Sequence, residues 1–364
     1  MLKNKTIAVV VPAYNEEKQI EMVLDTMPDF VDRIIVVNDK STDNTAKVVR
    51  EYIEKDIKEV RDLSHNKKIV PNKYNRADVV VEEMREQEKD LYTPSEIANN
   101  NPKKSRIILI NHLKNGSVGA SIATGYKWCL DNNIDCTAVM AGDGQMDPGE
   151  LESICLPVVD EEVDYVKGNR LKHRSARLVI PRIRYAGNSI LSLLTKIASG
   201  YWQISDTQTG YTAISLNALK GIYIYDIYPS YGCPNDILVK LNIASFAIKE
   251  VPIKPVYNVG EESKMKMVKV IPRISWLLFK LFWIRLYKKY LFRDFHPLFF
   301  LYHLSIVLLL ANIPYLIAVF TDLFGGQKIS TNSFIAFMFL GITGFQSLFF
   351  AMWMDMMDNE KLQK

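Results

Sequence analysis

The stretch VMAGDGQMDP at residues 139–148 decides how the rest of the sequence is interpreted. A short apolar run stops there at a carboxylate, Asp143, and an amide, Gln145, stands two residues further on. A buried strand that presents an acid and an amide at its carboxyl end suits a divalent cation such as Mg²⁺ or Mn²⁺, which prefers oxygen ligands and shares the phosphates of a substrate. The alternative is a strand-end turn in which Asp and Gly serve only the backbone conformation.

The segments on either side of this stretch alternate between strand and helix patterns. Residues 6–11, 33–37, 106–110 and 137–141 are apolar runs typical of strands that are buried on both faces. Helical patterns with short links lie between most of them. This repeated order predicts an α/β domain with a doubly wound, mostly parallel sheet over residues 1–255.

Residues 61–105 interrupt this alternation with a polar, charged segment. A structureless link of that length is unusual inside a compact domain, so we interpret it as an insertion with one short helix near residues 77–87. The four cysteines form no CxxC pair, which fits reduced thiols in a cytosolic setting. The first residues run into a strand too soon to form a signal peptide.

The composition changes after residue 255. Residues 264–293 hold nine Lys or Arg and no acid, with Trp and Phe side chains between the charges. We interpret residues 256–296 as a juxtamembrane segment whose amphipathic helix lies in the membrane interface, against anionic lipids. A nucleic-acid-binding face is the rival interpretation, and the segments that follow disfavour it.

Two apolar segments follow, at residues 297–320 and 334–354, and neither contains Asp, Glu, Lys or Arg. Each is long enough to cross a bilayer as a helix. Basic residues precede the first span, so the positive-inside rule assigns the large domain and a short tail, residues 355–364, to the cytoplasm. The sequence therefore predicts a multi-pass protein of the cell membrane with a cytoplasmic α/β domain.

Acidic residues follow several of the predicted strands. Ligands bind outside the carboxyl ends of the strands in an open parallel sheet, so we expect Asp39 and Asp143 to border one site. Such a site suits a nucleotide, held by one acid through its ribose or base and by the other through a metal-bound diphosphate. Lys114 could neutralise phosphate. The sequence has no GxGxxG after a strand and no GxxxxGK[ST], which weakens dehydrogenase and NTPase interpretations.

Eight motifs stand in an order typical of one family. They are PAYNE at 12–16, NDKSTDNT at 38–45, NGSVGAS at 115–121, GDGQMDP at 142–148, GNR at 168–170, SDTQTGY at 205–211, YGCPND at 231–236 and VYNVGEESK at 256–264. Together they resemble the family 2 glycosyltransferases. The chain is most similar to the branch of dolichyl- or polyprenyl-phosphate hexose synthases with two carboxyl-terminal membrane helices. The resemblance covers nearly the whole chain apart from residues 61–105.

This resemblance implies a Rossmann-like GT-A fold, a GDP- or UDP-sugar donor, a divalent metal and inversion at the anomeric carbon. It assigns the metal and the diphosphate to Asp143 and Gln145. Ala141 stands where the family usually has an Asp, which removes one carboxylate and puts the strength of metal binding in question. The resemblance assigns the nucleotide to Pro12, Tyr14, Glu16, Asp39 and Lys114.

The acceptor side can be argued from chemistry. A lipid phosphate is already an anion, so it needs cations to position it rather than a strong base. The resemblance assigns this role to Arg170 and Arg184, with Arg182 as a substitute. Asp206 and Gln208 are expected to shape the acceptor side of the pocket, and a role in the turn alone is equally open for them.

A hydroxyl acceptor would need a carboxylate to take its proton. Asp236 stands where family members of that kind keep their base, although an acid in the first turn of a helix is a credible alternative role. The sequence as a whole predicts an inverting transferase that moves a hexose from a nucleotide sugar to a polyprenyl phosphate. The alternatives are transfer to a hydroxyl of a lipid-linked or surface glycan, and a non-catalytic membrane scaffold that binds nucleotide or lipid. No nucleic-acid partner is expected, and self-association is left open.

Overall fold

The computed structural model describes residues 2–56, 58, 60, 63, 70–180, 182–256 and 267–364, without the side chains of residues 177, 182–186, 188 and 267–269. Within this part of the chain, eight strands form one sheet in the order β3-β4-β2-β1-β5-β7-β6-β8. The strands are β1 (Ile7–Ala13), β2 (Arg33–Asn38), β3 (Ser95–Ile97), β4 (Ile107–His112), β5 (Cys136–Val139), β6 (Tyr165–Asn169), β7 (Thr212–Ser215) and β8 (Ile248–Pro252).

Most of the sheet is parallel. β1 pairs with β2 and β5, β2 with β4, and β6 with β8, all in parallel, whereas β3 and β7 run opposite to their neighbours. The strand order changes direction at β1, because β2 lies on one side of it and β5 on the other. A crevice at the carboxyl ends of these strands is the expected place for a ligand.

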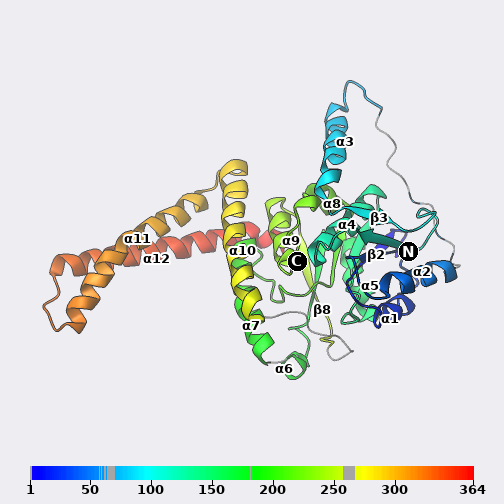
Figure 1. Ribbon diagram of the computed structural model, residues 1–364. Coiled ribbons are helices and arrows are strands. Elements are labelled where there is room, and N and C mark those ends of the chain that lie inside the picture. The colour runs from blue at the N-terminus through cyan, green and yellow to red at the C-terminus, as the bar shows by residue number, and fades with distance from the viewer. Residues whose placement is uncertain are drawn as a thin grey trace.

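Each central strand contributes to two apolar cores, because successive residues point to opposite faces of a sheet. Val9 and Ile34 pack on the side of α1, α2 and α5, whereas Val10 and Ile35 pack on the side of α4, α8 and α9 (Figure 1). This two-sided burial explains why the strands are continuous apolar runs. The helices of the domain are α1 (Ile20–Asp25), α2 (Thr45–Lys55), α3 (Arg76–Glu88), α4 (Val118–Asp131), α5 (Leu151–Val159), α6 (Ala176–Val179), α7 (Arg182–Ser199), α8 (Leu216–Gly221) and α9 (Cys233–Ile243).

The segment predicted as an insertion contains more structure than expected. Helix α3 lies where a short helix was predicted, buries none of its residues and projects away from the sheet (Figure 1). The same segment ends in β3, which pairs antiparallel with β4 at the edge of the sheet. No strand pattern marks β3 in the sequence, because its three residues, Ser-Glu-Ile, are all exposed. The strand forms through its pairing with β4. Residues 61, 62 and 64–69 of the segment lie outside the described residues.

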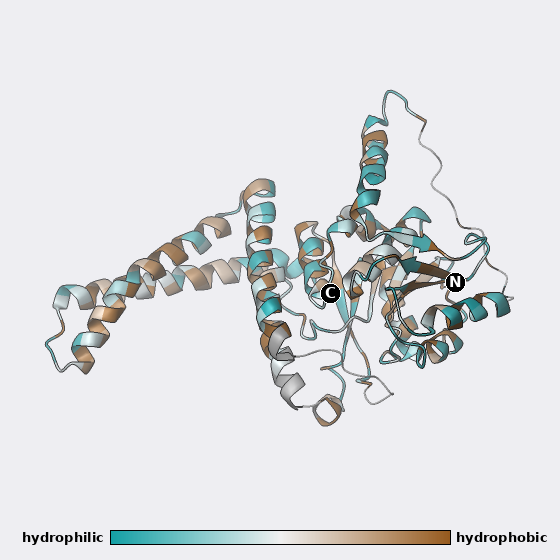
Figure 2. Cartoon of the chain, viewed as in Figure 1, coloured by the Kyte–Doolittle hydropathy of each residue, from teal (hydrophilic) through white to brown (hydrophobic). Residues whose placement is uncertain are grey.

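The carboxyl-terminal part begins with α10 (Met267–Tyr287) and a π-helical turn at Lys288–Arg293. Two long helices, α11 (Pro297–Phe324) and α12 (Thr331–Asn359), then pack against each other and extend away from the sheet (Figure 1). Both are long and apolar enough to span a membrane, and apolar residues, in brown, occur along both of them in Figure 2. Only 17% of the most apolar window of each is buried, unlike the core helix of a soluble protein.

The last residues of the chain return to the α/β domain rather than extending as a tail. A short 3-10 helix, Glu360–Leu362, follows α12, and Leu362 packs against the core beside α4 and α9. Gln363 then forms a parallel bridge with Ile248 of β8. The sequence did not indicate this return because the contact joins residues more than a hundred positions apart.

Candidate active site

The direction of the strands brings the predicted site residues to one edge of the sheet. β1, β2, β4, β5 and β6 all point their carboxyl ends to this edge, and β7, which runs the other way, begins there. The loops that follow the first group carry Tyr14, Asp39, Lys114, Asp143 and Arg170. The loop before β7 carries Asp206 and Gln208.

The loops after β1 and β2 are joined by hydrogen bonds. The Asn15 carboxamide oxygen accepts the backbone N–H of Thr42 at 2.8 Å, and the Ser41 hydroxyl accepts that of Asn15 at 2.9 Å. The Thr45 hydroxyl accepts the N–H of Glu16 at 2.9 Å. Asn15 has a φ of 55°, a left-handed conformation that Asn tolerates better than most residues. The result is a fixed frame on which the Tyr14 ring is 39% exposed.

Asp39 anchors the loop that precedes α4. Its buried carboxylate accepts the backbone N–H groups of Gly116 at 2.7 Å and Ser117 at 2.8 Å. It also lies 2.8 Å from Nδ1 of His112, whose Nε2 lies 2.9 Å from the Thr124 hydroxyl. Asp39 therefore holds the Asn-Gly-Ser turn in place, and the exposed Lys114 stands on that turn. A nucleotide contact by Asp39 stays a prediction.

The loop after β5 presents two oxygen-bearing side chains. Gly144 has a φ of 73°, which favours glycine, and the Asp143 carboxylate accepts the backbone N–H of Gln145 at 3.0 Å. Both side chains are half-buried. Among the described residues, no three or more His, Cys, Asp or Glu side chains gather as a metal site. Metal binding by Asp143 and Gln145 stays a prediction.

Asp147, the second acid of this loop, has a structural role. It accepts the N–H of Gly149 at 2.9 Å at the start of a 3-10 helix, Pro148–Glu150, and pairs with Lys254 at 2.8 Å. The hydrogen bond from Lys254 lowers the pKa of Asp147. The Tyr211 hydroxyl donates to the Asp147 carbonyl at 3.0 Å, which ties this loop to the one before β7.

A buried cluster of charges lies on the other half of the edge. Arg170 donates to both carboxylate oxygens of Asp206, from Nε at 2.8 Å and from Nη2 at 3.0 Å. Asp206 is fully buried and also accepts the backbone N–H of Arg170. Burial alone would raise the pKa of Asp206, but the Arg170 guanidinium holds it below its usual range. Asp206 therefore fixes the orientation of Arg170, which the sequence did not specify.

Two members of this cluster were missed by the sequence analysis. Lys167 lies fully buried in β6 and donates to the Thr209 carbonyl, and burial lowers its pKa to about 8. Glu250 of β8 accepts the backbone N–H groups of Ser205 at 2.8 Å and Asp206 at 3.1 Å. A lysine within an otherwise buried strand was the available signal for Lys167, because such a charge requires partners.

The structure places the other residues that were predicted to bind the acceptor less completely. Arg182 and Arg184 belong to the first turn of α7, and their side chains lie outside the described part of the structure. Gln208 is half-buried and donates to the Thr207 hydroxyl at 2.9 Å. The roles of these three residues stay predictions.

Asp236 lies in the first turn of α9 and is 3% exposed. One carboxylate oxygen accepts both the backbone N–H of Tyr228 at 2.9 Å and the Lys240 ammonium at 2.7 Å. Burial raises the pKa of Asp236, and Lys240 opposes this effect. These contacts match the alternative role of a first-turn acid; its role as a base stays a prediction.

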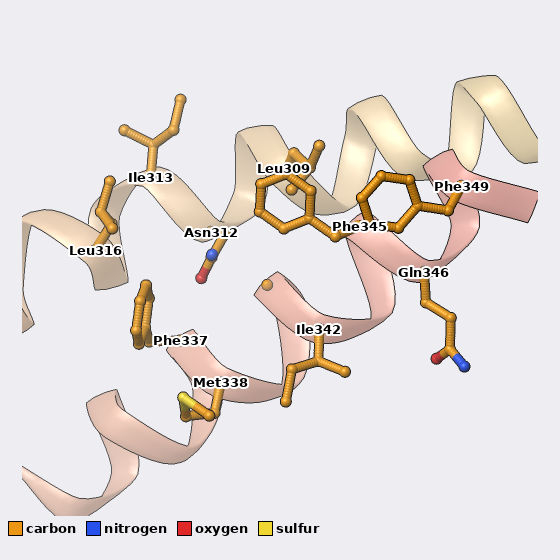
Figure 3. Close-up of a pocket in the computed structure, with 11 residues that line it drawn as sticks. Leu309, Asn312, Ile313, Leu316, Phe337, Met338, Ile342, Phe345, Gln346 and Phe349 are labelled. Atoms are coloured by element: carbon orange, nitrogen blue, oxygen red, sulfur yellow. The ribbon is translucent and has the colours of Figure 1, made fainter. Parts of the chain in front are cut away.

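A separate groove lies outside this edge of the sheet. A groove of about 730 Å³ between α11 and α12 is lined almost entirely by apolar side chains, with Asn312 and Gln346 as polar exceptions (Figure 3). All of its lining residues belong to the two long helices, so it lies outside the charged edge of the sheet. Its lining offers no charged group for a diphosphate.

Residues 8–77, which carry the β1 and β2 loops of this edge, match the family described as Glycosyl transferase family 2. The chain contains a family 2 glycosyltransferase domain. It is therefore an enzyme of the transferase class. The sheet order and the two long helices confirm the predicted fold class, a mostly parallel α/β domain followed by two apolar helices.

Curated relatives of this glycosyltransferase include three that match over most of its length. A UDP-N-acetylglucosamine–dolichyl-phosphate N-acetylglucosaminyltransferase of Methanococcus voltae is 29% identical over 71% of this chain and 88% of its own. An uncharacterised protein of Methanocaldococcus jannaschii is 28% identical over 76% of this chain and 90% of its own. A dolichyl-phosphate beta-glucosyltransferase of Trichomonas vaginalis is 25% identical over 71% of this chain and 65% of its own.

Among solved structures, the glycosyltransferase is similar to glucosyl-3-phosphoglycerate synthase from Mycobacterium tuberculosis. One structure of that enzyme matches with a TM-score of 0.46 and 20% identity, over 78% of this chain and 81% of the other. Another, in complex with Mn²⁺, UDP and glucosyl-3-phosphoglycerate, matches with a TM-score of 0.45 and 16% identity, over 78% of this chain and 80% of the other.

Proposed function

We propose that this glycosyltransferase moves a hexose from a nucleotide sugar to a polyprenyl or dolichyl phosphate at the cytoplasmic face of a membrane. The observation that carries the proposal is the position of α7. This helix begins with the predicted acceptor arginines and packs along α10, where Leu191 and Ala198 meet Ile274 and Leu278. The helix that begins with the predicted acceptor arginines and the predicted interfacial helix thus pack together as one unit.

This unit and the neighbouring α6 expose several large apolar side chains. Leu178 of α6 is 89% exposed, and Ile190 and Leu193 of α7 are 62% and 56% exposed. Trp276 and Phe279 of α10 stack on each other and are also more than half exposed. Exposed apolar and aromatic side chains together with basic residues are typical of a surface in the interface of a bilayer. An acceptor with its phosphate at the interface and its tail in lipid would meet the site from this side.

The chemistry needs no strong base. An oxygen of the acceptor phosphate would form the new bond to the anomeric carbon, and the bond from that carbon to the nucleoside diphosphate would break, with inversion. Arg170, oriented by Asp206, and the arginines at the start of α7 would hold the phosphate. The lowered pKa of Asp206 keeps this carboxylate charged, so it holds Arg170 over a wide pH range.

The donor half would bind the nucleotide on the frame formed by the β1 and β2 loops. Tyr14 and Glu16 stand on this frame, and the exposed Lys114 would neutralise charge on the diphosphate. The oxygens of Asp143 and Gln145 fit a divalent cation that keeps waters and binds phosphate oxygens, as Mg²⁺ and Mn²⁺ do. When bound, the cation would neutralise charge on the leaving diphosphate.

The orientation in the membrane is part of the proposal. Basic residues are concentrated in α10 and the π-helical turn, next to the start of α11, and the link between α11 and α12 carries few charges. The positive-inside rule then assigns the α/β domain to the cytoplasm, where nucleotide sugars are found.

The test is to incubate membranes that contain the full chain with a panel of radiolabelled nucleotide sugars and polyprenyl phosphate. We expect label in a lipid-extractable product that mild acid releases, because a sugar phosphate ester is acid-labile. Label that appears only in an acid-stable glycolipid would overturn the proposal and favour transfer to a hydroxyl. Nucleotide binding without any transfer would favour the non-catalytic scaffold.

A further inference from the structure

A second buried polar network lies where the cytoplasmic end of α12 meets the catalytic domain, close to α9 (Figure 1). We call it the Arg285–Asp355 network. Its members come from α10 and the π-helical turn (Arg285, Lys289, Tyr290), from α12 (Asp355, Asp358, Asn359) and from α9 (Asn242).

Arg285 joins three helices at the centre of this network. Its guanidinium donates to both carboxylate oxygens of Asp355, at 2.7 and 2.8 Å, and both side chains are fully buried. The same group donates to the backbone carbonyls of Ile197 at 3.0 Å and Ala198 at 2.9 Å. These carbonyls belong to the last turn of α7, where a helix leaves its C=O groups without partners. Arg285 of α10 therefore ties the end of α7 to the end of α12.

Asn359 adds a second connection, to α9. Its carboxamide oxygen accepts from Asn242 at 2.7 Å and from the Lys289 ammonium at 2.7 Å. Its amide nitrogen donates to the Tyr290 hydroxyl at 2.8 Å, and that hydroxyl donates to Asp355 at 2.6 Å. The second apolar helix is therefore fixed to two helices of the catalytic domain, and not only to α11.

A buried ion pair contributes little net stability compared with apolar residues of the same size. Apolar contacts are not directional, so they would allow α12 to turn or slide against α7. A guanidinium that binds a carboxylate with two parallel hydrogen bonds permits one geometry. The ion pair between Arg285 and Asp355 therefore fixes the orientation of α12 relative to α7, rather than adding net stability.

Because α7 is long, a small change in its tilt at one end displaces its other end by several ångströms. The network holds its carboxyl-terminal end, whereas the predicted acceptor arginines lie at its amino-terminal end. Eighteen residues of α-helix, from Arg182 to Ser199, extend over roughly 27 Å, so a tilt of about 10° at one end moves the other by about 5 Å. Shifts far smaller than this reduce the rate of a transfer reaction.

We propose that Arg285 and Asp355 are positioning residues that set the height of the acceptor site above the membrane. This inference rests on the proposed function, in which the acceptor phosphate lies at the depth of the membrane interface. A soluble acceptor can approach at any height, whereas the phosphate of a lipid in the bilayer cannot. The network therefore makes the enzyme efficient with acceptors embedded in a bilayer.

The kinetic test compares two acceptors, a long-chain polyprenyl phosphate in nanodiscs and a short-chain, water-soluble isoprenyl phosphate. In the full-length Asp355→Asn variant we expect KM for the long-chain acceptor to rise about tenfold to a hundredfold. We expect KM for the soluble acceptor and the affinity for nucleotide to stay within about twofold of the wild type. Arg285→Lys, which keeps the charge but loses the paired hydrogen bonds, should be intermediate.

The matched control is Asp294→Asn, the same substitution in an exposed ion pair of the same juxtamembrane segment. This substitution should leave KM unchanged for both acceptors. Should Asp355→Asn fail to fold, the apolar pair Arg285→Met with Asp355→Leu replaces it, because such exchanges often keep stability while they remove the geometry. An equal rise in KM for both acceptors, or no rise in KM for the long-chain acceptor, would overturn the proposal.

A measurement without turnover separates this proposal from the proposed function. A fluorophore on Ile190→Cys of α7 reports its depth by quenching with lipids brominated at known positions; Ile190 is exposed, and the four native cysteines are buried. We expect the fluorophore to lie at one depth in the otherwise wild-type chain. In Asp355→Asn we expect its depth to change or its distribution of depths to broaden. An unchanged depth would refute the positioning role even if the wild type transferred sugar. A changed depth in a chain that transfers no sugar to either phosphate would support the positioning role and refute the proposed function.

Discussion

The two halves of the candidate active site are held together in different ways. The predicted donor half, after β1, β2 and β5, consists of loops held by hydrogen bonds between short polar side chains and backbone N–H groups. The acceptor half, after β6 and before β7, consists of buried charges, with Lys167 and Arg170 facing Asp206 and Glu250. The donor half thus has a rigid frame that leaves its binding groups accessible, whereas the acceptor half holds its cation by an opposing buried charge.

The two halves should therefore respond differently to substitution. Neutral hydrogen bonds each contribute about 1 kcal/mol, so the donor frame tolerates the loss of one. A buried charge that loses its partner costs several times as much. Substitutions in the donor half should therefore affect chemistry more than stability, and substitutions in the acceptor half should affect both.

The largest effect is expected for Asp143→Ala. It removes the carboxylate assigned to the metal, so transfer should fall by about 100-fold or more while the thermal stability of the protein stays close to wild type. Initial rates of transfer, with Mn²⁺ binding measured on the same preparations, provide the check. Asp147→Asn is the control, since Asp147 caps a helix and pairs with Lys254 instead. Substantial activity in Asp143→Ala would mean that the loop after β5 has been interpreted wrongly.

The second-largest effect is expected for Asp206→Asn, which should lower both activity and stability. It leaves Arg170 and Lys167 without their carboxylate in a buried site, which should lower the free energy of unfolding by about 3 kcal/mol. We expect KM for the acceptor phosphate to rise about tenfold, with nucleotide affinity unchanged. Denaturation in detergent and kinetics with varied acceptor are the measurements. A variant that loses nucleotide binding first would contradict the division into two halves.

Ala141→Asp should strengthen metal binding by the donor half. It restores a carboxylate where relatives usually have one, so the affinity for Mn²⁺ should rise, by about tenfold. Titration of the metal by calorimetry, with and without nucleotide, gives the answer, and Ala141→Asn controls for size. Weaker or unchanged metal binding would show that residue 141 does not face the cation.

The smallest effect is expected for Asp236→Asn. Its carboxylate is bound to Lys240 and to the N–H of Tyr228, and a phosphate acceptor needs no base, so transfer should fall by less than about threefold. Transfer assays with Lys240→Met in parallel would separate the loss of the ion pair from the loss of a base. A drop of about 100-fold or more in Asp236→Asn alone would favour a hydroxyl acceptor.

The positions of the loops in the donor half were easier to predict from the sequence than the contacts in the acceptor half, for a physical reason. Strands such as residues 6–11 and 33–37 are recognisable because local periodicity reports burial, and the sites at their ends follow from the direction of a parallel sheet. The position of Asp39 was predictable in this way. Its partner His112 was not, since it lies 73 residues away.

The acceptor half depends on contacts over longer distances in the sequence. Glu250 accepts from Ser205 and Asp206 across about 45 positions, and Arg285 finds Asp355 across 70. No local pattern reports such pairs. What the sequence did offer was the presence of charges inside apolar elements, Lys167 in a strand and Asp355 at the end of an apolar helix, and each such charge indicates that a partner exists without naming it.

The return of the last residues to β8 has a consequence for the order in which the protein is made. Leu362 and Gln363 follow both apolar helices in the sequence, yet they pack against the core and the edge strand of a domain that is synthesised before those helices. An uncovered edge strand can pair with other chains. We therefore expect the nascent domain to keep β8 open until the second helix is inserted and the chain returns, so that assembly of the sheet is completed only at the membrane.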